Sequence, residues 1–273
     1  MVDVLKEVIR LREEGKEGVL ITVVEKIGSG PSRVGDKMLV KPDGSKLGTV
    51  GGGTLEQIAV KRALSILKEK KNLLEKYDLS GEGDKGAVRS SMLCGGNVSL
   101  FYEYIGTGPR VYIFGAGHVG KALVYHLRKL NYFITVIDSR KDILEDLEGA
   151  HKKILTGYEK AIEDIEIPEG SFFVITTHSH VTDYTVLKKI YEADGKPCYI
   201  GLVASPNKAS TLVKRLRSEL KKDIDLNILY TPVGLDIGGE TPHEIAISII
   251  SEMQAVRYGK SGHHHLKMEW SSS

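Results

Sequence analysis

The sequence predicts an α/β protein with a small mixed α/β N-terminal domain, followed by a Rossmann-like, doubly wound parallel sheet. The second half alternates strand-like and helical segments, which is the pattern of a parallel sheet covered by helices on both faces. The first half has hairpin-like strands and two segments with helical periodicity. A chain of 273 residues is long enough for two domains, each with its own core.

The expected domain boundaries follow this change in pattern. We predict an N-terminal domain over residues 1–106, a linker over 107–110 with the sequence "TGPR", and a Rossmann nucleotide-binding domain over 111–260. The polar segment 261–273, which includes three consecutive histidines, has no periodicity and is predicted to be a disordered tail.

Composition excludes several classes of protein. The formal net charge is only +2, without long runs of one sign, which argues against a nucleic-acid-binding surface. No apolar stretch approaches the ~20 residues that span a bilayer, and the first residues lack the apolar block of a signal peptide. We therefore expect a cytoplasmic protein without a membrane partner. The two cysteines, Cys94 and Cys198, give neither a disulfide framework nor zinc-ligand spacing, so no metal site is predicted.

The elements of the first half can be assigned in order. Apolar residues at helical spacing in 4–11, ended by Gly15, predict an amphipathic helix. The β-branched run 18–25 predicts a strand, and 37–50 predicts a hairpin around Pro42, Asp43 and Gly44. A long helix is expected over 54–72, directly after three glycines, with strands at 72–80 and 97–105.

The second half gives six strand-like segments and a closing helix. Thr241, Pro242 and Glu244 supply a cap, a first-turn proline and the return carboxylate of a capping box for that helix. The predicted strands are residues 111–115, 133–138, 152–156, 171–177, 197–203 and 226–233.

A dinucleotide fingerprint follows the first of these strands. Gly115, Gly117 and Gly120 have G-x-G-x-x-G spacing, and the next predicted strand ends in Asp138, where a carboxylate can accept a bond from a ribose 2′-hydroxyl. We infer NAD over NADP, although Arg140 leaves NADP open because it could face a phosphate. A Rossmann-like domain that binds nothing is the alternative. The expected nucleotide-binding residues are Gly115, Gly117, His118, Val119, Gly120, Asp138, Ser139, Arg140, Thr177 and His178.

Two patterns are candidates for a hydride-transfer apparatus. Tyr184 and Lys188 have the Y-x-x-x-K spacing of short-chain dehydrogenases, but Tyr125 and Lys129 repeat it by chance. "TTHSHVTD", residues 176–183, lies at a predicted strand end, where such folds bind ligands. This segment could bind a metal, orient a polar ligand, or be a solvated strand end.

The first half contains a second set of candidate ligand groups. Arg33 and Lys37 in the glycine and serine loop "IGSGPSRVGDKM" can meet an anion, and the helix start at "GGGTLE" offers backbone N–H groups to one. The thiol of Cys94 lies among glycines in "MLCGG", where it can ligate a soft metal or carry sulfur. The alternative is that the glycines serve tight turns and Cys94 packs as a small hydrophobe.

These motifs together resemble the XdhC/CoxI family of xanthine dehydrogenase accessory proteins. The resemblance rests on "GSGPSRVGDKMLV", "GTVGGGTLEQIAVKRAL", "MLCGGNVSLFYE", "VYIFGAGHVGKAL", "VIDSR", "TTHSHVTD", "YIGLVAS" and "TPVGLDIGGETPHEIAISIISEM". It implies an XdhC domain before a Rossmann domain. It further implies a non-catalytic accessory protein that binds molybdenum cofactor (molybdopterin), aids its sulfuration by a cysteine desulfurase, and delivers it to an apo molybdenum hydroxylase.

The resemblance also assigns residues and partners. The expected molybdenum cofactor residues are Ser29, Arg33, Lys37, Gly51, Gly52, Gly53, Thr54, Glu56, Cys94, Gly95 and Gly96. Thr54 stands where the CoxI-like branch often has a cysteine, and here it is a candidate cap for the helix. We also expect a homodimer with an interface at "IAISIISEMQAV". An NAD(P)-dependent oxidoreductase of a small carbonyl substrate remains the alternative, and a scaffold with a vestigial nucleotide site is a third possibility.

Overall fold

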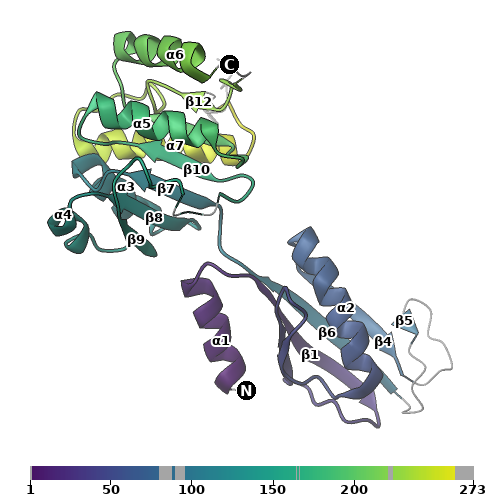
Figure 1. Cartoon of the computed structure of the whole chain (residues 1–273). Helices are drawn as coiled ribbons and strands as arrows, with labels where there is room; N and C mark the ends of the chain where they lie inside the picture. Colours follow the sequence, from purple (N-terminus) through teal and green to yellow (C-terminus); the bar gives the residue numbers. More distant parts are fainter. Residues whose placement is uncertain are drawn as a thin grey trace, which may run out of the picture. The chain divides into compact units, whose positions relative to one another are not determined.

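The chain divides into two compact units, Met1–Thr107 and Gly108–Ser273. The structure is a computed structural model that describes residues 2–79, 88–89, 96–163, 165, 167–220 and 224–261 (Figure 1). Within these residues, no helix combines the length and the apolar character needed to cross a bilayer. Each unit has its own sheet and its own hydrophobic core.

The first unit is built on a six-stranded sheet. Its strands are β1 (Gly18–Gly28), β2 (Lys37–Val40), β3 (Lys46–Gly48), β4 (Leu73–Asp78), β5 (Val88–Arg89) and β6 (Gly96–Ile105), in the spatial order β3-β2-β1-β6-β4-β5. All pairs are antiparallel except β4 with the two-residue β5. The hairpin predicted around Pro42 to Gly44 is confirmed as the β2–β3 pair.

Two helices pack on this sheet, one on each face. Alternate residues of β1 point to opposite faces, so Val19 and Ile21 share a core with α2 (Gly53–Glu69), while Leu20 packs with α1 (Val2–Glu13). Gly15, with φ 68°, follows α1 as the sequence predicted. The sheet is therefore covered by α2 along one face and by α1 on part of the other.

The second unit has a fully parallel six-stranded sheet. Its strands are β7 (Arg110–Phe114), β8 (Phe133–Asp138), β9 (Lys152–Leu155), β10 (Phe172–Ile175), β11 (Tyr199–Leu202) and β12 (Leu229–Tyr230), in the order β12-β11-β10-β7-β8-β9. This order confirms the Rossmann-like expectation. The strand order reverses between β7 and β10, and open α/β sheets bind ligands beside the carboxyl ends of the strands at such a switch point.

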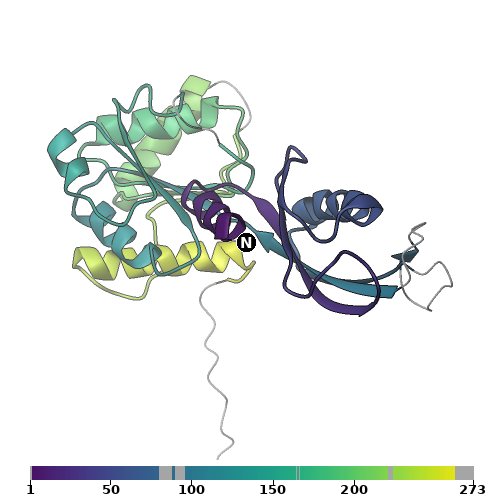
Figure 2. The same ribbon diagram turned by 90° about the horizontal axis from the view of Figure 1, so that it is seen from below.

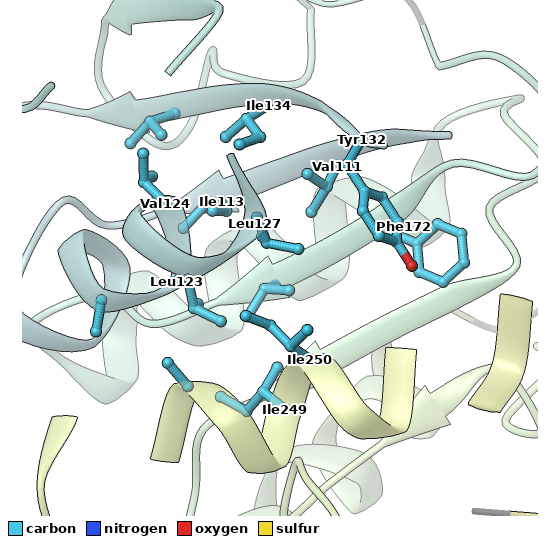
Figure 3. Packing of buried hydrophobic residues seen from close by; sticks show 14 of the residues in the cluster. Val111, Ile113, Leu123, Val124, Leu127, Tyr132, Ile134, Phe172, Ile249 and Ile250 are labelled. Atoms are coloured by element: carbon cyan, nitrogen blue, oxygen red, sulfur yellow. The ribbon is translucent and has the colours of Figure 1, made fainter. Parts of the chain in front are cut away.

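Helices cover both faces of the parallel sheet. On one face, α3 (His118–Leu127) and α7 (Pro242–Arg257) bury a cluster that includes Leu123, Ile249 and Ile250 (Figure 3). On the other face, α5 (His180–Glu192) and α6 (Pro206–Leu220) pack over Phe173 and Ile200, and the short α4 (Lys141–Glu145) follows β8. Figure 2 shows α7, the yellow helix, beside α3.

The closing motif 231–253 begins with a loop, residues 231–241, that is attached to α7 at several points. The capping box of Thr241 and Glu244 is present, as the sequence predicted. Ser248 donates a hydrogen bond to the carbonyl oxygen of Leu235, and the buried Glu252 accepts hydrogen bonds from the Gly234 amide and the Tyr199 hydroxyl. Most apolar residues of α7 are used inside the unit, and Ile247 is an exposed exception.

Candidate functional site

The glycine loop between β7 and α3 has the geometry that a nucleotide pyrophosphate requires. Gly115 has φ 109°, and a Cβ there would lie 2.4 Å from the carbonyl oxygen of Thr176. A Cβ at Gly120 would lie 1.9 Å from the carbonyl oxygen of Gly115, so neither position accepts a side chain. Gly117 caps α3 without any side-chain hydrogen bond to the helix, and a Cβ there would meet nothing within 4 Å. The start of α3 is therefore open to an anion.

Asp138, the expected ribose carboxylate, lies beside this loop but is completely buried. Its Oδ2 accepts hydrogen bonds from the Ala116 amide and from Nη2 of Arg140, both at 2.7 Å. Its Oδ1 accepts from the amide and from Nε of Arg140, both at 2.9 Å. Burial acts to raise the pKa of Asp138, but the hydrogen bonds from Arg140 and Ala116 outweigh it and hold the pKa below its ordinary value.

A cavity of about 300 Å³ opens at the carboxyl ends of β10 and β11. Thr177, His178 and Asp183 contribute to its lining from the β10 side, and Ser205 and Lys208 from the β11 side. The segments that begin α5 and α6 both border this cavity, so their amide-rich ends and the Lys208 amine favour an anionic or polar ligand.

Asp183 is the buried carboxylate of this cavity. Its Oδ1 accepts hydrogen bonds from the amide and the hydroxyl of Thr177, while Oδ2 lies 3.8 Å from Nδ1 of His180. Burial raises the pKa of Asp183, although the Thr177 bonds oppose this shift. A carboxyl group with a raised pKa beside a histidine can take part in proton transfer.

Tyr184 and Lys188 do not form a catalytic pair at this edge. The Tyr184 ring is buried beneath the guanidinium of Arg215, which lies 3.9 Å from the ring centroid. Lys188 binds the Glu219 carboxylate at 2.8 Å. Both residues therefore join α5 to α6, and the Y-x-x-x-K spacing has a structural explanation.

In the first unit, the three consecutive glycines form a turn that enters α2. Gly51, Gly52 and Gly53 have φ values of 123°, 78° and 60°, which side chains rarely adopt. The N-cap of α2 is Gly52, without a side-chain cap. The expectation that Thr54 caps the helix is wrong, because Thr54 already lies inside α2 and its side chain is past the capping position.

Glu56 holds this turn in place. Its buried carboxylate accepts hydrogen bonds from Lys46, from the Thr49 hydroxyl, and from the amides of Val50 and Gly52. Burial acts to raise the pKa of Glu56, but these bonds outweigh it and the pKa is lowered. Glu56 is thus bound within the protein, and the first amides of α2 beyond Gly52 have no side-chain partner among the described residues.

The structure brings the two loops of the first unit into contact through Ser32. The Ser32 hydroxyl is buried and donates a hydrogen bond of 2.7 Å to the carbonyl oxygen of Val50. Arg33 next to it is exposed, and its amide bonds the Asp36 carboxylate at 2.8 Å. The Lys37 amine donates to the Thr22 hydroxyl at 3.0 Å. Ser29 is exposed in the same loop, which the Ser32 bond to Val50 holds beside the glycine turn.

The two cysteines lie in different units of the chain. Cys94 and Gly95 lie outside the described residues, while Gly96 begins β6, with φ 147°. Cys198 is half-buried in the second unit, and its thiol donates to the carbonyl oxygen of Gly170 at 3.2 Å. Burial raises the pKa of Cys198, which keeps it a thiol and makes it a poor nucleophile at neutral pH.

Several residues of these sites were missed by sequence reasoning. Ser32 and Lys46 organise the glycine turn, Tyr158 lies near Asp138, and Lys208 lines the cavity. A single serine, lysine or tyrosine has no distinctive spacing, and only the folded chain brings these side chains to the site. Within the described ranges, no group of three or more metal-ligating side chains occurs, histidines 178 and 180 included.

The fold and the glycine loop place the second unit in the class of Rossmann-like domains, and comparison with family models agrees. Residues 111–253 match the XdhC Rossmann domain, and residues 11–78 match the XdhC and CoxI family. The protein therefore belongs to the XdhC and CoxI family.

Known proteins resemble this chain along most of its length. The uncharacterized protein YqeB of Escherichia coli (strain K12) is 32% identical over 95% of the chain, but the chain spans only 47% of YqeB. A probable xanthine dehydrogenase subunit from Bacillus subtilis (strain 168) is 24% identical, with 90% of this chain and 95% of that protein covered. The molybdenum cofactor insertion chaperone PaoD of Escherichia coli (strain K12) is 21% identical, with 93% and 88% covered.

A solved structure shares the fold. The crystal structure of a xanthine dehydrogenase from Bacillus halodurans superposes with a TM-score of 0.50 and 22% identity, over 96% of this chain and 97% of that one. This likeness extends through both units.

Proposed function

We propose that this protein is an accessory factor in the maturation of a molybdenum hydroxylase of the xanthine dehydrogenase type. Its cargo is molybdenum cofactor, which it holds during sulfuration and insertion. The proposal is carried by the relationship to PaoD, a molybdenum cofactor insertion chaperone, over 93% of the chain. An apo molybdenum hydroxylase and a cysteine desulfurase are the proposed partners, with the accessory protein acting as a cytoplasmic homodimer.

The glycine turn of the first unit fits the anionic part of such a cargo. Molybdopterin carries a phosphate and an anionic dithiolene, and the uncapped start of α2 offers backbone N–H groups to negative charge. A Cβ at Gly52 would meet nothing within 4 Å, so there is open space in front of the turn. Arg33 is exposed on the adjoining loop and adds positive charge to this surface.

The test is cofactor binding and delivery. Purified wild-type protein should bind molybdenum cofactor and increase the activation of an apo-hydroxylase by cofactor and desulfurase. Cys94→Ala should lower the sulfuration yield, whereas the matched thiol control Cys198→Ala should not, because Cys198 lies in the other unit with a raised pKa. Absence of both binding and stimulation in wild type would refute the proposal. Unchanged sulfuration by Cys94→Ala would remove Cys94 from it.

In this proposal the Rossmann unit binds a nucleotide, NAD or NADP, through the loop between β7 and α3. Support comes from the glycine geometry and from the open N-terminus of α3. Binding of either dinucleotide to the full chain by calorimetry, and its loss in Gly117→Asp, would support this part. A side chain at Gly117 enters open space, so the aspartate places negative charge where the pyrophosphate is expected.

The cavity beside Asp183 favours a second candidate function, an NAD(P)-dependent oxidoreductase of a small carbonyl compound. Its acidic and histidine groups lie at the edge where such a substrate would meet a nicotinamide. This candidate predicts NAD(P)H oxidation with some member of a panel of aldehydes and ketones, abolished by Asp183→Asn. Dinucleotide binding without turnover across the panel would reject it.

A further inference from the structure

The Asp138 carboxylate has no capacity left for a ribose hydroxyl. Each of its oxygens already accepts two hydrogen bonds, which is the usual capacity of a carboxylate oxygen. None of its surface is exposed. A 2′-hydroxyl would therefore have to displace one of the present donors, and displacing the Arg140 guanidinium would leave a buried carboxylate without its counter-charge.

Arg140 covers the carboxylate and is the group that a ligand would meet. Its Nε and Nη2 face Asp138, while 37% of its side chain is exposed. The bidentate bond to Asp138 fixes the plane of the guanidinium, and a guanidinium oriented in this way is suited to a phosphate oxygen.

Tyr158 provides a second, independent observation at the same place. Only 4% of Tyr158 is exposed, and its hydroxyl has no hydrogen-bond partner within the described part of the chain. Burial raises the pKa of Tyr158, and the nearby Asp138 charge adds to the shift, so the phenol keeps its proton and can donate it in a hydrogen bond. Buried hydroxyls are nearly always paired, and an unpaired one beside an arginine fits a site that a ligand completes.

We propose that the Rossmann unit selects an adenine nucleotide with a phosphate on the ribose 2′-oxygen, as in NADP, and that Arg140 is the residue that selects it. The proposal rests on the nucleotide-binding part of the proposed function and names the ligand class for that site. Position 2′ follows from the fold, because residues at the end of the strand after the glycine loop face this oxygen. Arg140 gives the phosphate a charged donor, whereas a 2′-hydroxyl finds no free acceptor on Asp138.

The test compares three small probes on the full chain by calorimetry at one fixed ionic strength of about 0.15 M, where the Debye length is about 8 Å. These are AMP, adenosine 2′,5′-bisphosphate and adenosine 3′,5′-bisphosphate. Wild type should bind the 2′,5′ isomer at least about tenfold more tightly than AMP, which is the factor expected from one charge-assisted hydrogen bond of about 1.4 kcal/mol. It should also bind the 3′,5′ isomer, which resembles the adenosine end of coenzyme A, more weakly than the 2′,5′ isomer.

Variants then locate the selectivity. The ratio to follow is the affinity for the 2′,5′ isomer divided by the affinity for AMP. Arg140→Ala should reduce this ratio to near one. Arg140→Lys should give a ratio between those of Arg140→Ala and wild type, because one point charge replaces the planar guanidinium. Lys141→Ala is the matched control, since Lys141 is an adjacent exposed cation that contacts Glu145. This variant should keep the wild-type ratio within about twofold, because salt screens the charge of an exposed lysine. Tyr158→Phe should lower the ratio by less than Arg140→Ala.

The outcomes are separable from those of the cargo experiment. Arg140→Ala leaves the Asp138 charge buried, so Asp138→Asn with Arg140→Ala provides a second variant without that charge if the single variant unfolds. AMP binding as tight as the 2′,5′ isomer overturns the proposal, as does tighter binding of the 3′,5′ isomer or no binding of any probe. None of these results bears on the proposal that the first unit binds molybdenum cofactor, which is tested separately.

Discussion

The Ser32 hydroxyl and the Val50 carbonyl oxygen, 2.7 Å apart, join the two loops of the first unit that carry its glycines. Ser32 is only 1% exposed, so the bond is shielded from water. Val50 directly precedes the glycine turn, and Ser32 lies in the loop that carries Arg33. The relative position of two sequence motifs that are far apart therefore depends in part on one hydroxyl group.

Replacing Ser32 with alanine should destabilise the first unit. The change leaves the Val50 carbonyl oxygen without this donor, which typically costs about 1–3 kcal/mol for a buried group. Urea unfolding followed by circular dichroism measures the loss. Ser218→Ala is the control, because that hydroxyl bonds the Arg215 carbonyl oxygen on an exposed helix, and it should change stability by less than about 0.5 kcal/mol. If Ser32→Ala and Ser218→Ala lowered the stability equally, the Ser32 hydrogen bond would not have the proposed structural role.

Alanine at Gly51 and at Gly52 should have different consequences. Both residues have positive φ, so each change costs about 1–2 kcal/mol in backbone strain. At Gly51 the new Cβ would also lie 2.2 Å from the Ser32 Oγ, so the larger loss of stability is expected there. At Gly52 the Cβ enters open space, and the main effect should be weaker cargo binding. Thermal unfolding of both variants measures the loss of stability, and a titration with the cofactor measures the loss of affinity. A larger loss of stability for Gly52→Ala than for Gly51→Ala would contradict this prediction.

The contribution of Glu56 to stability should depend on pH. Its pKa in the folded protein lies below the ordinary 4.5, so its hydrogen bonds stabilise fully above that value and are lost as the pH falls through the lowered pKa. Glu56→Gln should therefore be less stable than wild type at pH 7, by about 1–3 kcal/mol for the weakened bonds to a charged group. The difference should shrink below pH 4.5.

Urea unfolding at a series of pH values measures this difference. Glu13→Gln is the control in the same unit, because Glu13 is exposed on α1 and its removal should change stability by less than about 0.5 kcal/mol at any pH. A Glu56→Gln difference that stayed constant down to pH 3 would show that the carboxylate charge is not the cause.

The loop before α7 should become mobile when its anchor on Glu252 is weakened. Tyr199→Phe removes one of the two donors to the buried Oε1, at a cost of about 1–3 kcal/mol. Glu252→Ala removes the acceptor for both donors and should cost more. Hydrogen exchange at the Gly234 amide should accelerate in Glu252→Ala. Tyr191→Phe, which removes an exposed hydroxyl bond to the Asp225 carbonyl oxygen, should leave that amide protected.

Much of the fold could be predicted because local sequence and tertiary structure agree. The six strand segments of the second unit, the hairpin of the first, and the capping box of α7 all carry signals within a few residues. The G-x-G-x-x-G spacing also predicted the turn at Gly115, although the backbone that excludes a side chain there belongs to Thr176, which is distant in the sequence. The other features depend mainly on neighbours in the chain.

The sites were harder to predict because their contacts are not local. Asp138 was expected to face a ribose, but the side chain two residues later folds back and saturates it. Thr54 was expected to cap α2, but the N-cap is Gly52, two residues earlier, in a turn whose positive φ values favour glycine. Glu56, predicted to be a ligand residue, bonds Thr49 and Lys46, contacts that no local pattern indicated. A residue type at the right position thus predicts which chemistry is present, but its partners decide whether it is available.

The separate cores of the two units have a consequence for cooperativity. The cluster around Val19 and Leu100 and the cluster around Val111 and Ile249 share no residue, so heating need not melt the chain in a single transition. The Ser32→Ala substitution would then lower the unfolding temperature of the first unit and leave that of the second unit unchanged. Mutations could accumulate in one half of the chain without eroding the folding of the other, which would let the two proposed binding surfaces diverge at different rates.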